Sequence, residues 1–364
     1  MVDFKNSYTF LQEGAKRQEA ANKGVPDRVP IIAQMPEFAR KELGIGPREF
    51  YSSPELIVAG TLEVMERYCI DSPYLDFDVY NIEPEGLGME VLWTDESQPG
   101  LNYSKPIITD ENDLKKIKTP DFDSVGRFSH VLEIYRQYEK LTGGVLPPFR
   151  CSAPFTLAAN IRGASNLLIE IFMKPDFVKE LLNRITEEVL GPWLLRVKKE
   201  FPKLKEIGAD DAFGSLPIVS PDIMRDWVMP PVLKLKELVG PEVYVPNWVG
   251  ERYLSNPEVM LDMKKQVCQD FIRVQDPDVE KLTPNIFKEY ANKHNINLCL
   301  GVGATSLDSA SPAEVKSRVK NYLQVGSPGG RLTLYLCTLS AATSPENVRA
   351  AVGAVHKYGT YKKN

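Results

Sequence analysis

The chain has 364 residues, and its 44 Lys+Arg against 49 Asp+Glu give a formal charge of −5. With 43% hydrophobic and 26% charged residues, the composition is typical of a folded soluble protein and excludes a disordered one. The acidic balance disfavours nucleic-acid binding, which needs a basic patch, and no apolar run approaches the roughly 20 residues that span a bilayer. We therefore expect neither a nucleic-acid nor a membrane partner.

Length alone predicts either two ordinary domains or one large barrel. The first 26 residues are polar and charged and lack the apolar core of a signal peptide. Five cysteines are widely spaced and form no CxxC pair, which favours a reducing compartment over a disulfide framework. We expect a cytoplasmic protein.

Short apolar runs alternate with long amphipathic stretches from residue 28 to the C-terminus. The runs predict strands at 29–33, 73–79, 145–151, 204–209, 243–246, 271–274, 297–302 and 332–336. The stretches predict helices at 53–69, 129–141, 164–172, 175–200, 220–239, 256–268, 285–294, 312–323 and 344–358. Several of these helices begin with Ser-Pro, a serine N-cap followed by proline at the first helical position.

Eight strands, each followed by helical segments, predict an α/β protein made of a single (β/α)₈ TIM barrel. We expect an N-terminal helical extension over 1–27 and the barrel over 28–364. The segment 81–120 interrupts the alternation after the second strand and predicts a long loop or hairpin over the barrel mouth. A doubly wound open sheet is the alternative, but no GxGxxG follows the first strand.

Histidine, the usual general base and the commonest metal ligand, occurs only three times. His130, His294 and His356 all lie in predicted helices, where we expect solvated side chains and not catalysts. An enzyme with this sequence would work with carboxylates, tyrosines, arginines, backbone amides or a cysteine.

In a barrel of this type the chemistry lies at the C-terminal ends of the strands. Those ends carry Gln34, Asp76, Asp78, Tyr80, Glu83, Arg150, Asp210, Asp211, Asn247, Trp248, Glu251, Asp276 and Cys337. Glu251 and Asp276 are equally well interpreted as loop charges or helix caps. Asp78, Asp210 and Asp211 end apolar strands, and clustered carboxylates in a half-buried mouth raise one another's pKa, which makes a carboxyl a general acid near neutral pH.

Four segments carry a family resemblance that extends over about residues 28–358. The segment 78–88 resembles the one that follows the second strand in the uroporphyrinogen decarboxylase superfamily, closest to its corrinoid methyltransferase branch. The segment 153–159 with Arg162-Gly163 resembles the family's PFTLA…G pattern, and 208–211 with Ser220-Pro221 resembles its GAD…SP pattern. Cys337 followed by 343–347 resembles the closing C…TPxEN motif. The resemblance implies a single (β/α)₈ barrel.

Two departures from the family narrow the function that the resemblance implies. The decarboxylases carry an arginine-rich motif after strand one and a Gly-His-Gly near the end, whereas this chain has only Arg40 and Leu336-Cys337-Thr338 there. Methyltransferases of the family that act on thiols bind zinc through His-x-Cys after strand five and a later cysteine. Here the strand-five site reads Asn247-Trp248, so only Cys337 remains. We expect no metal site unless Asp211 or Glu251 joins Cys337 to hold zinc.

The remaining chemistry is that of a corrinoid-dependent methyltransferase of demethylase type, which acts on a small methylated, for example methoxyaromatic, molecule. The chain lacks Asp-x-His-x-x-Gly, so the corrinoid would come on a separate partner protein. A carboxylic acid or Tyr80 would protonate the departing oxygen. The catalytic candidates are Asp78, Tyr80, Glu83 and Asp211. The candidates for substrate binding are Gln34, Arg150, Phe155, Asn160, Asp210, Asn247, Trp248 and Cys337.

Two alternatives stay open at this point. One is a decarboxylase or lyase of a small carboxylate, with Arg40, Arg150 or Arg162 as carboxylate clamp and Asp78 as proton donor. The other is a non-catalytic barrel that binds a tetrapyrrole or corrinoid.

Overall fold

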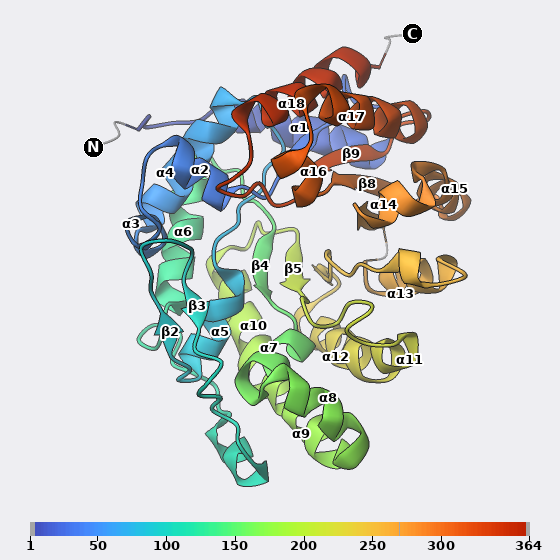
Figure 1. Ribbon diagram of the computed structural model, residues 1–364. Helices are drawn as coiled ribbons and strands as arrows, with labels where there is room; N and C mark the ends of the chain where they lie inside the picture. Colours follow the sequence, from blue (N-terminus) through green and yellow to red (C-terminus); the bar gives the residue numbers. More distant parts are fainter. Residues whose placement is uncertain (1–3, 269, 362–364) are drawn as a thin grey trace.

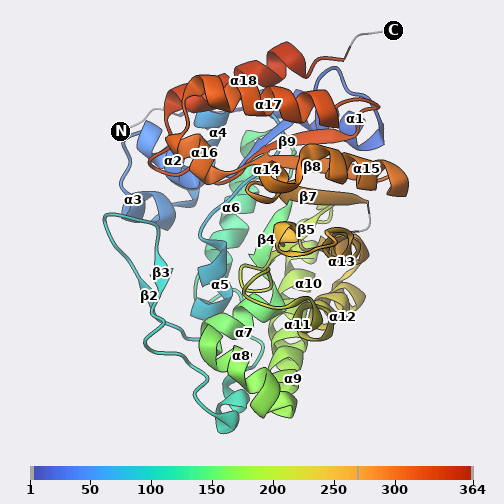
Figure 2. The same cartoon turned by 45° about the vertical axis from the view of Figure 1, so that its right-hand side comes forward.

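The computed structural model describes residues 4–268 and 270–361, and it shows parallel strands surrounded by helices (Figure 1). The parallel strands in this part of the chain are β1 (Ile31–Ala33), β4 (Phe149–Ser152), β5 (Ile207–Asp210), β6 (Val243–Tyr244), β7 (Phe271–Gln275), β8 (Asn297–Val302) and β9 (Leu332–Leu336). They pair in two arcs, β4-β5-β6 and β1-β9-β8-β7. Figure 2 shows β7, β8 and β9 side by side.

The predicted second strand is the exception. The segment 72–78 follows β1, and Ser72 donates from its backbone N to the carbonyl of Ile31 at 3.0 Å, but 73–78 forms no ladder. Pro73 has no N–H to donate, and Asp78 is already the N-cap of α5 (Val79–Gly86), which leaves too short a stretch for pairing. The segment still lies beside β4, because Arg150 contacts Tyr74 and Asp76. Eight extended segments in barrel order result.

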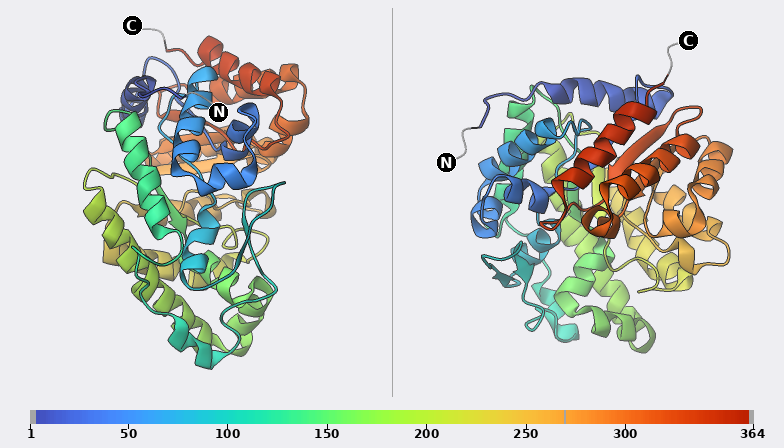
Figure 3. Two further views of the ribbon diagram at one scale, coloured as in Figure 1. Left: turned by 90° about the vertical axis from the view of Figure 1, so that its left-hand side faces the viewer. Right: turned by 45° about the horizontal axis from the view of Figure 1, so that its top comes forward.

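Helices follow nearly every strand and form the outer layer. The longer ones are α1 (Phe10–Lys23), α4 (Pro54–Arg67), α6 (Phe128–Leu141), α7 (Pro154–Arg162), α8 (Ala164–Met173), α9 (Pro175–Arg184), α10 (Gly191–Glu200), α12 (Met229–Val239), α13 (Glu258–Cys268), α15 (Pro284–His294), α17 (Pro312–Gly326) and α18 (Pro345–Tyr358). The shorter ones are α2 (Pro36–Glu42), α3 (Pro47–Ser52), α11 (Pro221–Ile223), α14 (Asp278–Leu282), α16 (Ala304–Ser309) and the 3₁₀ turns η1 (Glu111–Lys116) and η4 (Glu251–Tyr253). Figure 3 shows α17 and α18 packed against each other.

The helices predicted over 175–200 and 220–239 are each interrupted by a π-helical turn. These turns are η2 (Ile185–Leu190) and η3 (Met224–Val228). Pro192 follows the first, and Pro230-Pro231 follows the second. Proline lacks the N–H for the α-helical bond and its ring crowds the preceding turn, so the backbone widens locally while the helix continues.

Helix α1 lies across the N-terminal end of the barrel, within the expected N-terminal extension. Gln18 donates to Thr333 Oγ1 at the start of β9 (2.9 Å), and Ser72 donates to Gln18 (2.7 Å). Gly14 allows this approach, because an added Cβ would lie 1.6 Å from the carbonyl oxygen of Asp71. Arg17 forms ion pairs with Asp71 and Asp27. These contacts make α1 the floor of the barrel.

The segment 81–120 contains more structure than a loop. It continues α5, then forms a short antiparallel hairpin of β2 (Val91–Leu92) and β3 (Gly100–Leu101), and ends with η1. The hairpin region packs beside the strand ends, because Asn81 donates to the carbonyl of Pro99 (2.8 Å) and Tyr103 donates to Asn160 on α7 (3.3 Å). The helices of 4–268 and 270–361 are too short or too polar to cross a membrane.

Candidate active site

An arginine and an aspartate from neighbouring strands form the centre of the barrel mouth. Arg150 on β4 and Asp210 on β5 are both buried, and Arg150 Nε donates to Asp210 Oδ2 at 2.5 Å. Arg150 also donates to the hydroxyl of Tyr74, and its Nη1 lies 4.0 Å from Asp76. The guanidinium is therefore held by protein partners, and a role of Arg150 in substrate binding stays a prediction.

Asp76 belongs to this cluster and was not among our chosen site residues. Gln34 Nε2 donates to its Oδ2 at 2.6 Å, while its Oδ1 is buried and has no hydrogen-bond partner in the described residues. Burial, opposed by Arg150 and assisted by Asp210, raises the pKa of Asp76 to about 6. Its spacing of two residues from Tyr74 along an extended segment was the available signal, since such residues share one face.

Gln34, predicted to bind substrate, links the first and last strands of the barrel. Besides its bond to Asp76, its Oε1 accepts bonds from Tyr335 (2.8 Å) and Thr338 (3.0 Å). These bonds fix the amide orientation and aim its nitrogen at Asp76. Gln34 therefore acts on the site through Asp76.

Glu83 reaches the same region from α5. It is buried, and Ser152 at the end of β4 donates its backbone N to Glu83 Oε2 at 3.3 Å. Burial raises the pKa of Glu83 to about 7, while hydrogen bonds from Ser152 oppose the rise and Asp210 adds to it. Glu83 is thus a carboxyl that is partly protonated at neutral pH.

Asp78, one of the four catalytic candidates from the sequence, is held by an arginine from another part of the chain. Arg127 forms an ion pair with it at 2.6 Å, and Asn81 donates to it at 3.2 Å. Arg127 also pairs with Glu85, and its guanidinium lies 5.0 Å from the ring centre of Trp93 in the hairpin region. Burial raises the pKa of Asp78, and Arg127 opposes that rise. A carboxylate clamped by a guanidinium is a poor proton donor, so Asp78 is better interpreted as an anchor for α5.

Asp211 is the centre of a second network. It accepts bonds from Thr156 Oγ1 on α7 (2.6 Å), from Trp248 Nε1 (2.9 Å) and from the backbone N of Gly214 (3.2 Å). Its own backbone N donates to Asn247 Oδ1 at 2.8 Å. The structure therefore brings together three residues that the sequence singled out separately, namely Asp211, Asn247 and Trp248.

Tyr80 joins this network to α5. Asn247 Nδ2 donates to the Tyr80 hydroxyl at 3.0 Å, and Asn160 Nδ2 donates to the Tyr80 carbonyl at 3.3 Å. Burial raises the pKa of Tyr80 well above its usual value, and the nearby Asp210 adds to this effect. Because Tyr80 and Glu83 are three residues apart on α5, they lie on the same helix face.

Phe155 and Trp248, two aromatic residues predicted to bind substrate, are buried in the protein. Trp248 has no exposed surface, and its indole is held by Asp211. Phe155 on α7 is only 1% exposed and belongs to the main hydrophobic core. Both rings pack inside the protein behind the barrel mouth, and neither ring face is exposed to a ligand.

A small cavity of about 300 Å³ opens beside this network. Its lining includes Tyr103, Asn166 and Phe213. Tyr103 bonds to Asn160, and the backbone N of Phe213 donates to Thr156 (3.1 Å), so the cavity adjoins the Asp211 network. Its volume is at the lower end of the range for small-molecule sites.

The residues present do not form a zinc site of the family type. Asn247 and Trp248 are occupied by bonds to Tyr80 and Asp211, and burial raises the pKa of Cys337, which disfavours the thiolate that zinc requires. Glu251 is buried in an ion pair with Lys264. Residues 4–268 and 270–361 contain no group of three or more His, Cys, Asp or Glu side chains placed to hold a metal. We therefore derive no step through zinc.

The three arginines considered for a carboxylate clamp are all paired. Arg40 pairs with Glu37, and Arg162 forms two hydrogen bonds to Glu170 (2.8 and 2.7 Å). Arg150 pairs with Asp210 as described above. A substrate carboxylate would have to displace one of these partners, which weakens the interpretation as a decarboxylase.

The histidines lie on α6, α15 and α18, in the helical layer. His130 is half-buried, and burial together with Arg127 lowers its pKa to about 4. The Nε2 atom of His294 is buried as well. The expectation of solvated side chains is therefore wrong for these two, although their helical placement is as predicted.

Comparison with known proteins gives a match to a family and to a fold. The family model for uroporphyrinogen decarboxylase (URO-D) matches residues 15–191. This match covers slightly less than half of the chain and shows a similarity to that family over its N-terminal part. The structure of the chain resembles that of a methyltransferase from Methanosarcina mazei with a TM-score of 0.75 and 20% sequence identity, covering 95% of this chain and 98% of the other. No curated protein matches the chain.

The structural likeness spans almost the full length of both chains and confirms the α/β barrel fold predicted from the strand and helix pattern. Asp210 and Asp211 lie at the C-terminal end of β5, the end of the strands where (β/α)₈ barrels carry out their chemistry.

Proposed function

We propose that this chain is a corrinoid-dependent methyltransferase of demethylase type. It would move a methyl group between a small methylated molecule, such as a methoxyaromatic, and a corrinoid carried by a separate protein. The resemblance to a methyltransferase of the same fold supports the reaction class. The neutral donor set at Asn247 and Trp248 supports a substrate that needs no zinc for activation.

The observation that carries the proposal is the placement of Tyr80 and Glu83 on one face of α5, three residues apart. The Tyr80 oxygen accepts a bond from Asn247, and no acceptor for its own proton lies within hydrogen-bond distance among the described residues. The raised pKa keeps this phenol protonated. It can therefore donate to the oxygen of a bound ligand, while Glu83, with a pKa of about 7, can supply a proton at neutral pH.

In the proposed reaction a methyl ether loses its methyl group and becomes a phenol. A reduced corrinoid on the partner protein would supply the nucleophile that takes the methyl group as a new cobalt–carbon bond. The carbon–oxygen bond would break, and the oxygen would keep the electron pair. Tyr80 orients that oxygen and Glu83 delivers the proton to it, so the product is a phenol. Asp211 holds Asn247, and Asn247 holds Tyr80, so this chain positions the donor.

The test is methyl transfer to a Co(I) corrinoid from a panel of methoxylated aromatics and methylamines. The absorbance of the corrinoid reports its methylation. We expect Tyr80→Phe and Glu83→Gln each to lower the rate by about 10²-fold, the lower end of the range for general acid catalysis. Tyr358→Phe and Glu237→Gln, on α18 and α12, serve as matched controls with rates near that of the unmodified protein.

Three outcomes would overturn the proposal. No methylated corrinoid with any donor argues against a methyltransferase. Release of carbon dioxide from a carboxylate without corrinoid would indicate the decarboxylase alternative. Tight corrinoid binding without turnover, unaffected by loss of Glu83 and Asp211, would indicate a binding barrel.

A further inference from the structure

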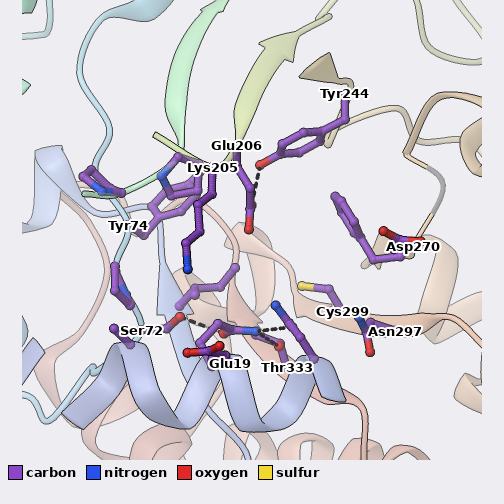
Figure 4. A pocket seen from close by; sticks show the side chains of 18 of the residues that line it. Glu19, Ser72, Tyr74, Lys205, Glu206, Tyr244, Asp270, Asn297, Cys299 and Thr333 are labelled. Carbon is purple, nitrogen blue, oxygen red and sulfur yellow. Dashed lines mark hydrogen bonds between the residues drawn. The ribbon is translucent and has the colours of Figure 1, made fainter. Parts of the chain in front are cut away.

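A second and larger cavity lies at the opposite end of the barrel from the mouth. It has a volume of about 1030 Å³ and lies between α1 and the N-terminal ends of the strands (Figure 4). Ser72, Lys205 and Phe271, each at or just before the start of an extended segment, line it together with Glu19 of α1. The proposed methyl-transfer site does not use it.

The inner wall of this cavity carries a guanidinium without a carboxylate partner. Arg273 on β7 lies over two tyrosine rings, 4.9 Å from the ring centre of Tyr335 and 5.9 Å from that of Tyr74. Among residues 4–268 and 270–361, no carboxylate oxygen lies within 4.0 Å of it, and its Nε is buried without a hydrogen-bond partner. A cation removed from bulk water is costly unless it is paired, so Arg273 is ready to bind an anion.

A carboxylate faces the same cavity from β5. Glu206 directly precedes the strand and accepts a hydrogen bond from Tyr244 at 3.3 Å (Figure 4). No Lys, Arg or His nitrogen of the described chain lies within 4.0 Å of it. Glu206 and Arg273 therefore share one cavity without pairing with each other.

Most other charges on the lining already have partners. Glu19 pairs with Lys23, Glu242 pairs with Lys198, and Lys16 pairs with Glu13. Lys203 pairs with Glu139, and Arg331 donates to the carbonyl and the side chain of Asn295. Lys205 and Asp270, which have opposite signs, are the remaining charged residues of the lining. The unpaired groups thus offer both a positive and a negative partner to one ligand.

We propose that this cavity binds a free amino acid with an apolar or aromatic side chain, its carboxylate on Arg273 and its ammonium on Glu206. A ligand with both charges satisfies both groups, whereas a dianion would be repelled by Glu206 and a simple cation by Arg273. Apolar and aromatic residues complete the walls. They include Ile32, Leu146, Leu298 and the edge-to-face pair of Tyr244 and Phe271, whose ring centres lie 5.1 Å apart.

The test uses calorimetric titration of the full chain with three probes of one shape. L-Phenylalanine carries both charges, 3-phenylpropionate only the carboxylate, and 2-phenylethylamine only the ammonium; L-leucine tests a smaller side chain. We expect at least one of the two amino acids to bind, and L-phenylalanine to bind at least tenfold more tightly than either single-charge probe. No binding of either amino acid at millimolar concentration would overturn the proposal, as would equal binding of all three phenyl probes.

Two variants locate the site. Glu206→Gln keeps the shape of the side chain but loses its charge. We expect it to weaken binding of the amino acid at least tenfold and to leave binding of 3-phenylpropionate unchanged. Arg273→Lys keeps the positive charge but loses the planar guanidinium, and we expect it to weaken binding of both the amino acid and 3-phenylpropionate. Circular dichroism establishes that each variant is folded. Tyr80→Phe, at the other end of the barrel, should not change binding; an effect there, or none from Glu206→Gln, would place the ligand elsewhere.

Discussion

Arg150 Nε and Asp210 Oδ2 are 2.5 Å apart on neighbouring parallel strands, at the centre of the barrel mouth. Both side chains are buried, and Arg150 also contacts Tyr74 and Asp76. The Arg150 guanidinium therefore compensates the negative charge of Asp210 and lies close to Asp76.

Removal of this guanidinium should strongly destabilise the folded protein. We expect Arg150→Met to lower the free energy of unfolding by about 3–5 kcal/mol, because Asp210 would remain buried without a partner. Arg136→Met is the matched control. Arg136 pairs with Glu133 and Glu200 at the surface, with a side chain 45% exposed, and its loss should cost about 1 kcal/mol or less. Urea denaturation measures both, and equal effects would contradict a central role for Arg150.

The network around Asp211 predicts a different defect. Asp211→Asn replaces one acceptor oxygen by an NH₂ group, which cannot accept the bond from the Trp248 indole or from Thr156. We expect a loss of about 1–3 kcal/mol of stability for the buried donor left without a partner, with an altered tryptophan emission. The exposed Asp226→Asn, which removes a surface pair with Arg225, should change stability by less than about 1 kcal/mol. Unchanged emission in Asp211→Asn would argue against this network.

Glu83 predicts the pH dependence of stability. Its pKa in the folded chain, about 7, is above the usual 4.5, so the native state binds more protons than the unfolded state between these values. Glu83 should therefore make stability fall as pH rises from 4.5 to 7, by roughly 1.4 kcal/mol per pH unit within that window.

The Glu83→Gln variant tests this relationship, since it has no proton to lose. Its stability relative to the unmodified protein should rise with pH through the window and level off above pH 7. Urea denaturation at pH 5, 6, 7 and 8 measures the difference. The exposed Glu237→Gln should follow the unmodified protein at every pH. Parallel curves for Glu83→Gln would show that its pKa is not raised.

Gly214 predicts the effect of crowding at Asp211. An added Cβ would lie 2.1 Å from Asp211 Oδ2 and 2.7 Å from Val228, so Gly214→Ala must displace one of them. We expect a loss of about 1–3 kcal/mol. Gly353→Ala, at an exposed site of α18 where an added Cβ meets nothing within 4 Å, should instead stabilise by about 0.5–1 kcal/mol. Thermal denaturation compares the two, and similar shifts would contradict the prediction.

Much of the fold could be predicted because hydrophobic periodicity reports secondary structure directly. The predicted strand 297–302 coincides with β8, and 332–336 coincides with β9. The second strand was predicted wrongly because an apolar run does not show that Pro73 and the early start of α5 prevent pairing. The two π-helical turns were missed for a similar reason, since prolines shift the hydrogen bonds without ending the helix.

The sequence by itself determined which residues end the strands, and so which acids and amides surround the mouth. It also determined that histidine and zinc-binding residues of the family type are missing at the strand-five position. Only the tertiary structure decided which of these acids pairs with a cation or a hydrogen-bond donor. Arg127 comes from 49 positions beyond Asp78 and clamps it, and Trp248 comes from 37 positions beyond Asp211 and bonds to it. The protonation of a carboxyl depends on its burial and on partners that are distant in sequence, and the neighbouring residues in the sequence indicate neither.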